Sequence, residues 1–242
     1  MRSSSHRPRK RFGQHFLHDP RVLAHLVEEI SPGKQDFLVE IGPGEGVLTD
    51  RLLDKAGTLE VIEIDRDLAA RLDKVKVHVA DALEFDYSIF PKGVRIIGNL
   101  PYNISTPLLF HLARYADRVR DMHFMLQLEV VERMVAAPST PAYGRLSVAL
   151  QARFRMKKLF NVGRGAFRPP PRVDSAVVRL EPLPQILEID EDLLRRAFSA
   201  RRKTLRNALP GVDFAAAGVD PTLRPENLSP ADYARLSMNS IL

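Results

Sequence analysis

The stretch VEIGPGEGVLT, residues 39–49, decides the fold, because it joins a short apolar run to a helical pattern through a glycine-rich turn. Gly42, Gly44 and Gly46 let the backbone come close to a ligand, and a helix that starts after such a turn offers free amides to a carboxylate or phosphate. Glycine-rich turns also occur for purely structural reasons, so the motif alone is weak evidence of a binding site. The segments that follow it distinguish the two interpretations.

Acidic residues end the next two strand-like segments. VIEIDRD places Glu63 and Asp65 about twenty residues after the turn, where an acid can bind both ribose hydroxyls of a nucleotide. Both side chains point to one face of an extended strand, so one is predicted to bind the ribose, with Glu63 preferred, and the other to cap the following helix. In VHVADALEF, Asp81 can accept a hydrogen bond from an adenine amino group or cap the next helix, and the sequence favours neither.

These residues suit the adenosine of either a dinucleotide or S-adenosylmethionine. The dinucleotide fingerprint GxGxxG requires a third glycine at position 47, where this chain has Val47. S-adenosylmethionine is therefore the predicted ligand, and a nicotinamide oxidoreductase is the less favoured alternative.

Short apolar runs alternate with helical patterns up to about residue 130. This alternation predicts an α/β fold whose mostly parallel sheet binds ligands beyond the carboxyl ends of its strands. An antiparallel hairpin with a long connection, GAFRPPPRVD, is predicted to close the sheet, since successive prolines cannot lie inside a central strand. The predicted strands are Phe37–Ile41, Thr58–Ile64, Val75–Ala80, Val94–Ile97, Met122–Gln127, Arg155–Val162 and Ser175–Leu180, with helices at Val47–Lys55 and Arg66–Lys74.

The segment EPLPQILEID, which follows Leu180, is a predicted linker because its prolines disfavour regular structure. Beyond it the patterns are helical, and the apolar residues of 194–209 lie on one stripe of a single predicted helix that Pro210 ends. The sequence thus predicts a ligand-binding domain at residues 1–182 and a small all-helical domain at residues 183–242.

In IIGNLPYNIST, residues 96–106, a polar and an aromatic residue follow a strand where the ligand is expected. An exocyclic adenine amine is a poor nucleophile because its lone pair is delocalised, so a catalyst must favour the pyramidal amine and aim it at the methyl group. The Asn99 side-chain oxygen and the Leu100 carbonyl can accept the amine hydrogens, with Pro101 fixing the turn and Tyr102 stacking on the base. Without the glycine turn, NLPY would indicate only an ordinary turn.

A base extruded from RNA also needs an aromatic side chain against the face that Tyr102 does not cover. Phe167, stiffened by the prolines at 169–171, is the predicted partner, since unstacked bases are commonly held between aromatic faces. The alternative is that Phe167 is a hydrophobic plug under the proline-rich loop.

Basic residues concentrate in two segments without acids, residues 1–12 and 195–206, while the rest of the chain is mildly acidic. One such cluster is typical of a solvated face, but two in one chain favour contact with the phosphates of RNA or DNA. The predicted RNA contacts are Arg9, Lys10, Arg11, Arg195, Arg201, Arg202, Lys203 and Arg206.

Several classes of site are excluded by composition. The chain has no cysteine and no paired histidine spacing, so the sequence predicts neither a disulfide, nor thiolate catalysis, nor a bound metal. It has no long uncharged apolar stretch and no signal-peptide core, which predicts a cytoplasmic protein with no membrane partner. We expect a monomer.

Motifs spread over nearly the full length resemble the bacterial small-subunit ribosomal RNA adenine dimethyltransferases. The matching segments are RKRFGQHFL, VEIGPGEGVLT, VIEIDRDLAARL, NLPYNISTP, YGRLSV, FRPPPRVDSAVVRL and RRKTLRN. The resemblance implies a Rossmann-like, seven-stranded S-adenosylmethionine-dependent methyltransferase fold with a small helical C-terminal domain. It also implies dimethylation of two adjacent adenosines in the 3′-terminal hairpin loop of 16S rRNA, within the small ribosomal subunit or its precursor.

The same resemblance implies a set of donor contacts, among which the role of Leu17 comes from the family alone. They are His15, Leu17, Gly42, Glu63, Asp81 and Asn99.

Two other functions remain as alternatives. The first is the related methylase that acts on large-subunit rRNA, against which RRKTLRN and NLPYNISTP argue. The second is an RNA-binding assembly factor in which the basic segments dominate and methyl transfer is incidental. An assembly role and methyl transfer are compatible in one protein.

Overall fold

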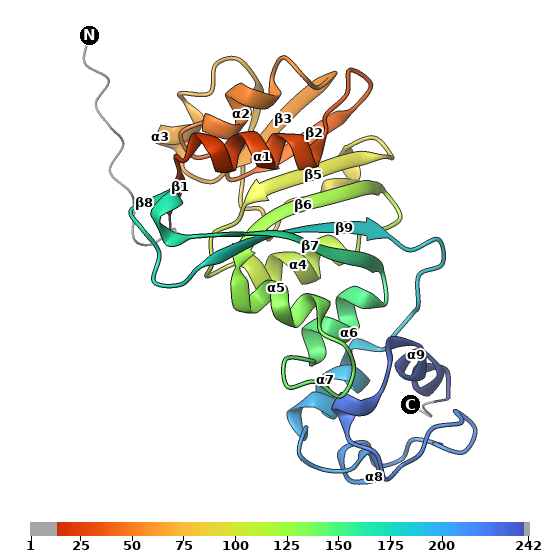
Figure 1. Cartoon of the computed structure of the whole chain (residues 1–242). Helices are drawn as coiled ribbons and strands as arrows, with labels where there is room; N and C mark the ends of the chain where they lie inside the picture. Colours follow the sequence, from red (N-terminus) through yellow and green to blue (C-terminus); the bar gives the residue numbers. More distant parts are fainter. Residues whose placement is uncertain (1–13, 240–242) are drawn as a thin grey trace. The chain divides into compact units, whose positions relative to one another are not determined.

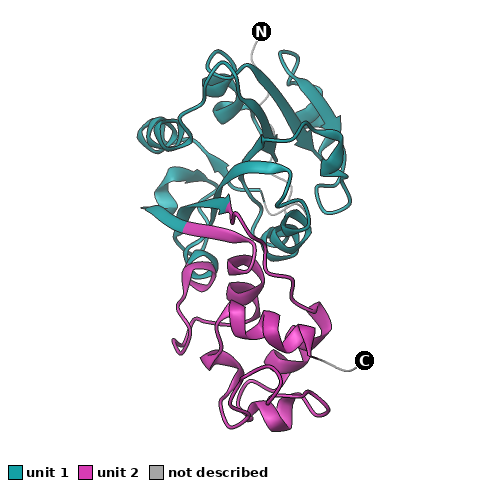
Figure 2. Cartoon of the chain, turned by 90° about the vertical axis from the view of Figure 1, so that its right-hand side faces the viewer, with its two compact units in different colours: residues 1–131, 157–181 teal, residues 132–156, 182–242 magenta. Residues whose placement is uncertain are grey.

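The computed structural model describes residues 14–239 and forms two compact units (Figure 2). Unit 1 comprises residues 1–131 and 157–181, and unit 2 comprises residues 132–156 and 182–242. Unit 2 therefore takes in residues 132–156, which the sequence assigned to the first domain, in addition to the segment beyond the predicted linker.

A seven-stranded sheet forms the centre of unit 1, in the order β4-β3-β2-β5-β6-β9-β7 (Figure 1). The five strands from β4 to β6 are parallel, and β9 pairs antiparallel with β6. All seven predicted strands are confirmed. Their bounds are β2 Phe37–Ile41, β3 Thr58–Glu63, β4 Lys76–Val79, β5 Val94–Asn99, β6 Val119–Gln127, β7 Phe154–Val162 and β9 Ser175–Pro182.

A second, two-stranded sheet was missed by the sequence analysis. β1 (Phe16–Leu17) pairs antiparallel with β8 (Phe167–Arg168), which lies in the connection between β7 and β9. Strands of two residues carry too little alternation to be recognised from sequence. This pairing brings the N-terminal segment next to the proline-rich loop.

The order of the strands reverses between β2 and β5. From β2 the chain passes outward to β3 and β4, and it then returns to add β5 on the other side of β2. In an open α/β sheet, ligands bind beyond the carboxyl ends of the strands at such a reversal. The glycine turn follows β2 and NLPY begins at the end of β5, so the two main motifs border this point.

Helices cover both faces of the sheet, with α1 (Pro20–Ile30) on one face and α4 (Ser105–Ala113) on the other (Figure 1). Asp19 caps α1 by accepting hydrogen bonds from two amides of its first turn, and proline stands at its first position. The apolar stripe of α1 then packs on β2, β5 and β9 in one core cluster. The remaining elements of unit 1 are α2 Val47–Leu52, α3 Arg66–Ala69, η2 Tyr87–Ile89, η3 Arg164–Ala166 and the first half of α5 Leu128–Val135.

Two of the predicted helices are shorter than expected. α2 ends at Leu52, and α3 ends at Ala69 because the next amides, of Arg71 and Leu72, bond to carbonyls only three residues back.

Unit 2 has its own apolar core, formed by the helices α6 Arg145–Gln151, α7 Glu191–Ser199, α8 Leu205–Ala208 and α9 Pro230–Met238, with η4 Pro225–Asn227. Two buried tyrosines satisfy their hydroxyls in it: Tyr143 donates to the Leu228 carbonyl and Tyr233 to the Pro225 carbonyl, both at 2.8 Å.

The single helix predicted over 194–209 is wrong, because α7 ends at Ser199 and α8 starts at Leu205. The amides of Leu205 and Arg206 donate to the carbonyls of Leu223 and Pro221 instead of continuing the helix. Leu205 and Leu209 remain buried in spite of the break.

A buried ion-pair network lies toward the amino ends of the central strands. Arg95 of β5 is 3% exposed and donates to Asp121 at 2.9 Å, to Asp36 at 2.6 Å and to the Ile30 carbonyl at 2.5 Å. Burial opposes ionisation of Asp36, but the Gly33 amide and the Arg95 guanidinium hold its pKa below the ordinary value. The network ties α1, β2, β5 and β6 together behind the ligand-binding edge.

Candidate active site

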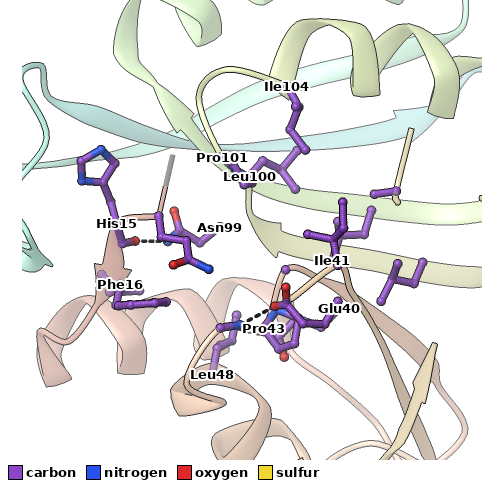
Figure 3. Close-up of a pocket in the computed structure, with 18 of the residues that line it drawn as sticks. His15, Phe16, Glu40, Ile41, Pro43, Leu48, Asn99, Leu100, Pro101 and Ile104 are labelled. Atoms are coloured by element: carbon purple, nitrogen blue, oxygen red, sulfur yellow. Dashed lines mark hydrogen bonds between the residues drawn. The ribbon is translucent and has the colours of Figure 1, made fainter. Parts of the chain in front are cut away.

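A cavity of about 280 Å³ opens at the carboxyl ends of β2, β3 and β5, wholly within unit 1 (Figure 3). Its volume is near the lower end of the range for small-molecule sites. The predicted donor contacts all line it, and so do Leu100, Pro101 and Tyr102. The structure thus brings together the glycine turn, Glu63, Asp81 and NLPY. From the sequence, these were expected to be close only because each follows a strand of the predicted parallel sheet.

The glycine turn needs glycine for its backbone conformation. Gly42, Gly44 and Gly46 have φ of 66°, 60° and 79°, in the left-handed region that other residues rarely adopt. A Cβ on Gly44 would also lie 2.9 Å from ring atoms of Phe16, which lines the cavity. The turn is therefore closely packed against the segment that precedes α1.

Glu63 and Asp65 divide the two predicted roles. The Glu63 carboxylate is 5% exposed, lines the cavity and accepts hydrogen bonds from the amides of Gly44 at 3.2 Å and Asp65 at 2.9 Å. Asp65 caps α3 by accepting from the Asp67 amide at 3.0 Å. Asp65 is thus the acid that caps the helix, and Glu63 is the one that faces the ligand site.

Asp81 lies at the cavity but does not cap a helix, because the residues directly after it form a turn. One carboxylate oxygen accepts from the Leu83 amide at 2.9 Å and so stabilises the turn after β4, while the residue lines the cavity.

The Asn99 side chain has a defined orientation. Its amide nitrogen donates to the His15 carbonyl at 2.9 Å (Figure 3). Because a carbonyl can only accept, this contact fixes which end of the amide is the nitrogen and leaves the oxygen as the acceptor for another partner.

Tyr102 is held between the N-terminal segment and β9. Its hydroxyl is 2.6 Å from the Ser175 hydroxyl, and its ring stacks on His15 with centroids 5.4 Å apart. His15 Nδ1 donates to the Pro169 carbonyl at 2.8 Å, which requires the proton to be on Nδ1. The imidazole thus links NLPY to the proline-rich loop.

Comparison with known proteins agrees with this geometry. The family model described as "Ribosomal RNA adenine dimethylase" matches residues 5–239. The chain belongs to this family. Proteins named "Ribosomal RNA small subunit methyltransferase A" from Aromatoleum aromaticum and Chromobacterium violaceum are 54% and 53% identical to it, over 97% of this chain in each case and 94% and 96% of theirs.

Solved structures extend the similarity. A dimethyladenosine transferase from Plasmodium falciparum has a TM-score of 0.79 at 28% identity, covering 92% of this chain and 96% of its own. The 23S rRNA methyltransferase ErmE has a TM-score of 0.69 at 26% identity, covering 93% of this chain and 99% of its own. The predicted Rossmann-like methyltransferase fold is confirmed.

One predicted site residue of this dimethylase is not at the cavity. Phe167 is 2% exposed and belongs to the core cluster that contains Leu17 and the apolar stripe of α1. Its ring has no free face for a base, because β8 turns it inward beneath the proline-rich loop. The structure therefore favours the alternative, in which Phe167 is a hydrophobic plug under the loop, over the prediction that it stacks on the base.

The predicted RNA contacts of the dimethylase fall into three groups. Arg9, Lys10 and Arg11 lie outside the described residues. Arg195 pairs with Asp192, and Arg201 pairs with Glu226 at 3.5 Å, so acidic neighbours partly neutralise these two cations. Arg202, Lys203 and Arg206 are exposed and, within residues 14–239, have no ion-pair partner.

Within residues 14–239, His, Asp and Glu do not form a group of three or more that could hold a metal ion. The described helices are all too short or too polar to cross a membrane.

Glu40 is a buried acidic residue of the cavity that was not predicted from the sequence. It is 2% exposed and accepts a hydrogen bond from the Thr49 hydroxyl at 2.6 Å. Burial, with a smaller contribution from the nearby Glu63, raises its pKa to about 7. A single charged residue inside the apolar run FLVEI was the signal that could have identified it.

Replacing Glu40 by glutamine is expected to stabilise the donor-free protein at pH 8. The buried carboxyl has a pKa near 7 and the unfolded one near 4.5, so the folded state binds the extra proton and stability falls as the pH rises through this interval. Glutamine keeps an acceptor for Thr49 and should gain up to about 3 kcal/mol at pH 8 and little at pH 4. Urea unfolding at both values measures this, with Glu45→Gln on the exposed turn as control. Equal stabilities at pH 8 would contradict it.

Proposed function

We propose that this dimethylase transfers methyl groups from S-adenosylmethionine to the exocyclic amines of two adjacent adenosines in the 3′-terminal hairpin loop of 16S rRNA, during biogenesis of the small subunit in the cytoplasm. The observation that carries the proposal is Asn99, whose amide is oriented by the His15 carbonyl at the edge of a cavity bordered by the glycine turn and Glu63.

The cavity residues suit the parts of the donor. The Glu63 carboxylate has lone pairs beyond those used by the two backbone amides and can accept from ribose hydroxyls. Asp81 keeps a second oxygen for an adenine amino group, and Gly42 and Gly44 provide a close backbone approach. When bound, S-adenosylmethionine supplies an electrophilic methyl group.

The acceptors of NLPY orient the nucleophile. The Asn99 oxygen and the Leu100 carbonyl can each accept one amine hydrogen, which favours the pyramidal amine and directs its lone pair toward the methyl group. The Tyr102 ring is held by Ser175 and His15, so it offers a fixed face for the base. No strong general base is needed, because the amine becomes very acidic once it is methylated and can lose its proton to water.

The choice of the small subunit is supported by the names of the relatives that are more than half identical to the chain. Structural likeness alone does not discriminate between small-subunit and large-subunit RNA, since a 23S rRNA methyltransferase shares the fold over most of the chain. The experiment is incubation with labelled S-adenosylmethionine and either small or large subunits purified without these methyl groups. We expect label in the small-subunit RNA, and label in the large-subunit RNA alone would contradict the proposal.

We also infer that the exposed cations of unit 2 bind the phosphates of the subunit. Reversing the charge of Arg202 and Lys203 to glutamate should weaken small-subunit binding and lower the slope of log affinity against log salt by about 1.4 to 1.8, the effect of two lost phosphate contacts. The matched control is Lys55→Glu with Lys92→Glu, two exposed lysines of unit 1 at the amino ends of the strands. An unchanged slope in the Arg202/Lys203 variant would identify this face as merely solvated.

A further inference from the structure

A third basic segment runs from the start of β7 to the end of the loop before β9. From Arg153 to Val173 the sequence has seven cationic side chains and no acid. Those of unit 1 are all exposed: Lys157, Lys158, Arg164, Arg168 and Arg172.

Acidic neighbours neutralise little of this charge. Arg164 lies 3.7 Å from Asp174, the first acid after the segment. Within residues 14–239, the side chains of Arg168 and Arg172 have no ion-pair partner. Two unpaired, exposed arginines thus stand on either side of the prolines at 169–171.

The loop that carries these arginines is attached to the rim of the catalytic cavity. Arg168 is directly opposite Phe16 in the β1–β8 pair, and Phe16 lines the cavity. The Pro169 carbonyl accepts from His15, and Ser175 at the other end of the loop bonds to the Tyr102 hydroxyl. Both ends of the loop therefore contact residues of the cavity.

The loop is also restrained between these ends. Three successive prolines fix φ, Pro171 is buried, and the Asp174 carbonyl accepts from the Leu128 amide at 3.0 Å. A restrained loop loses little conformational entropy when a ligand binds, so cations on it bind more strongly than the same cations on a free chain.

We propose that Arg168 and Arg172 bind the phosphates that flank the target adenosine, while its base enters the cavity. An adenosine within an RNA strand has a phosphate on each side, and arginine is well suited to bidentate contacts with phosphate. The inference rests on the proposed function, since it takes RNA as the substrate. It adds a positioning surface that holds the strand by its backbone, and these contacts carry no sequence information of their own.

The test is the double variant Arg168→Gln with Arg172→Gln, assayed on undermethylated small subunits. We expect the KM for the subunit to rise about 10-fold at 0.15 M salt, with kcat changed less than about 2-fold, because charge-assisted contacts to the strand are lost and the cavity is intact. The slope of log affinity against log salt should fall by about 1.4, the value for two contacts to a single strand. Affinity for S-adenosylmethionine, measured by calorimetry, should not change.

Matched variants make each outcome decisive. Arg168→Lys with Arg172→Lys keeps the charge and should restore most of the salt slope, whereas Lys55→Gln with Lys92→Gln removes equal charge far from the rim and should leave KM unchanged. An unchanged KM and slope in the Arg→Gln variant, or an equal loss in the Lys→Gln control, would overturn the proposal. If the Arg→Gln variant no longer binds S-adenosylmethionine, its cavity is damaged. The KM of the Arg→Lys variant for the subunit then replaces that of the Arg→Gln variant as the test.

Failure of this inference is distinguishable from failure of the proposed function. If the wild-type protein labels no ribosomal RNA, the proposed function is wrong. If the wild type labels the small subunit and the Arg→Gln variant does so with an unchanged KM, only the phosphate contacts are wrong. Equal competition by inorganic phosphate and by an RNA hairpin at the same phosphate concentration would indicate a simple anion site and would also overturn it.

Discussion

Asn99→Ala is expected to lower kcat for methyl transfer about 10²- to 10³-fold at saturating RNA and donor, the usual effect of removing one preorganised polar group that acts in the transition state. The side-chain oxygen is assigned to the amine hydrogens, and its orientation depends on the contact of the amide nitrogen with the His15 carbonyl. The affinity for small subunits should change less than about 2-fold, because the half-buried side chain makes no contact with the RNA backbone in this account. Single-turnover methylation and subunit binding measure the two effects separately.

Asn99→Asp separates the two contacts of this side chain. Aspartate keeps an acceptor for the amine but cannot donate to the His15 carbonyl. We expect it to retain more activity than alanine at saturating donor. Equal loss in both variants would indicate that the contact with His15 matters more than the acceptor, and near-normal turnover of Asn99→Ala would contradict the assigned role.

Arg95→Met is expected to cost about 3–5 kcal/mol of stability at pH 7, the usual effect of removing one partner from a buried ion pair. The substitution leaves the buried carboxylates of Asp36 and Asp121 without the guanidinium that donates to both. Urea unfolding followed by circular dichroism measures the effect, since the chain has no tryptophan for fluorescence. Arg120→Met is the matched control, because Arg120 also pairs with Asp36 but is 61% exposed and should contribute less than about 1 kcal/mol.

The loss in Arg95→Met should depend on pH. Although burial opposes ionisation, hydrogen bonds hold the pKa values of Asp36 and Asp121 below their ordinary values in the folded wild type. Stabilisation from such groups is present above the ordinary aspartate pKa, about 3.9, and is lost as the pH falls through the lowered values. The difference between wild type and variant should therefore be greatest near neutral pH and decrease below about pH 4. A difference independent of pH would attribute the loss to packing.

The strands and the ligand-binding edge could be predicted because they follow from local patterns. β2 to β6 are apolar runs with clear boundaries, and a parallel sheet must place its ligands beyond their carboxyl ends. Gly42, Gly44 and Glu63 could be placed at this edge for the same reason, since the glycine turn begins where β2 ends and Glu63 is the last residue of β3.

Features that depend on contacts between distant segments could not be predicted. The break between α7 and α8 results from amides of Leu205 and Arg206 that bond to the carbonyls of Leu223 and Pro221, far along the chain, so the continuous apolar stripe was misleading. The side chain of Phe167 points inward because β8 pairs with β1, and no pattern within either strand of two residues indicates this pairing. The cations between β7 and β9 are too widely spaced to appear as a cluster until the loop is seen beside the cavity.

Mass spectrometry of the modified RNA tests the central claim most directly. Small subunits that lack the modification would be incubated with the protein and labelled S-adenosylmethionine, and the 3′-terminal fragment of 16S rRNA would be digested to nucleosides. We predict N6,N6-dimethyladenosine at two adjacent positions of the terminal hairpin loop, absent when the protein carries Asn99→Ala. Binding of the subunit without any labelled adenosine would contradict the account and would favour an assembly factor without methyl transfer.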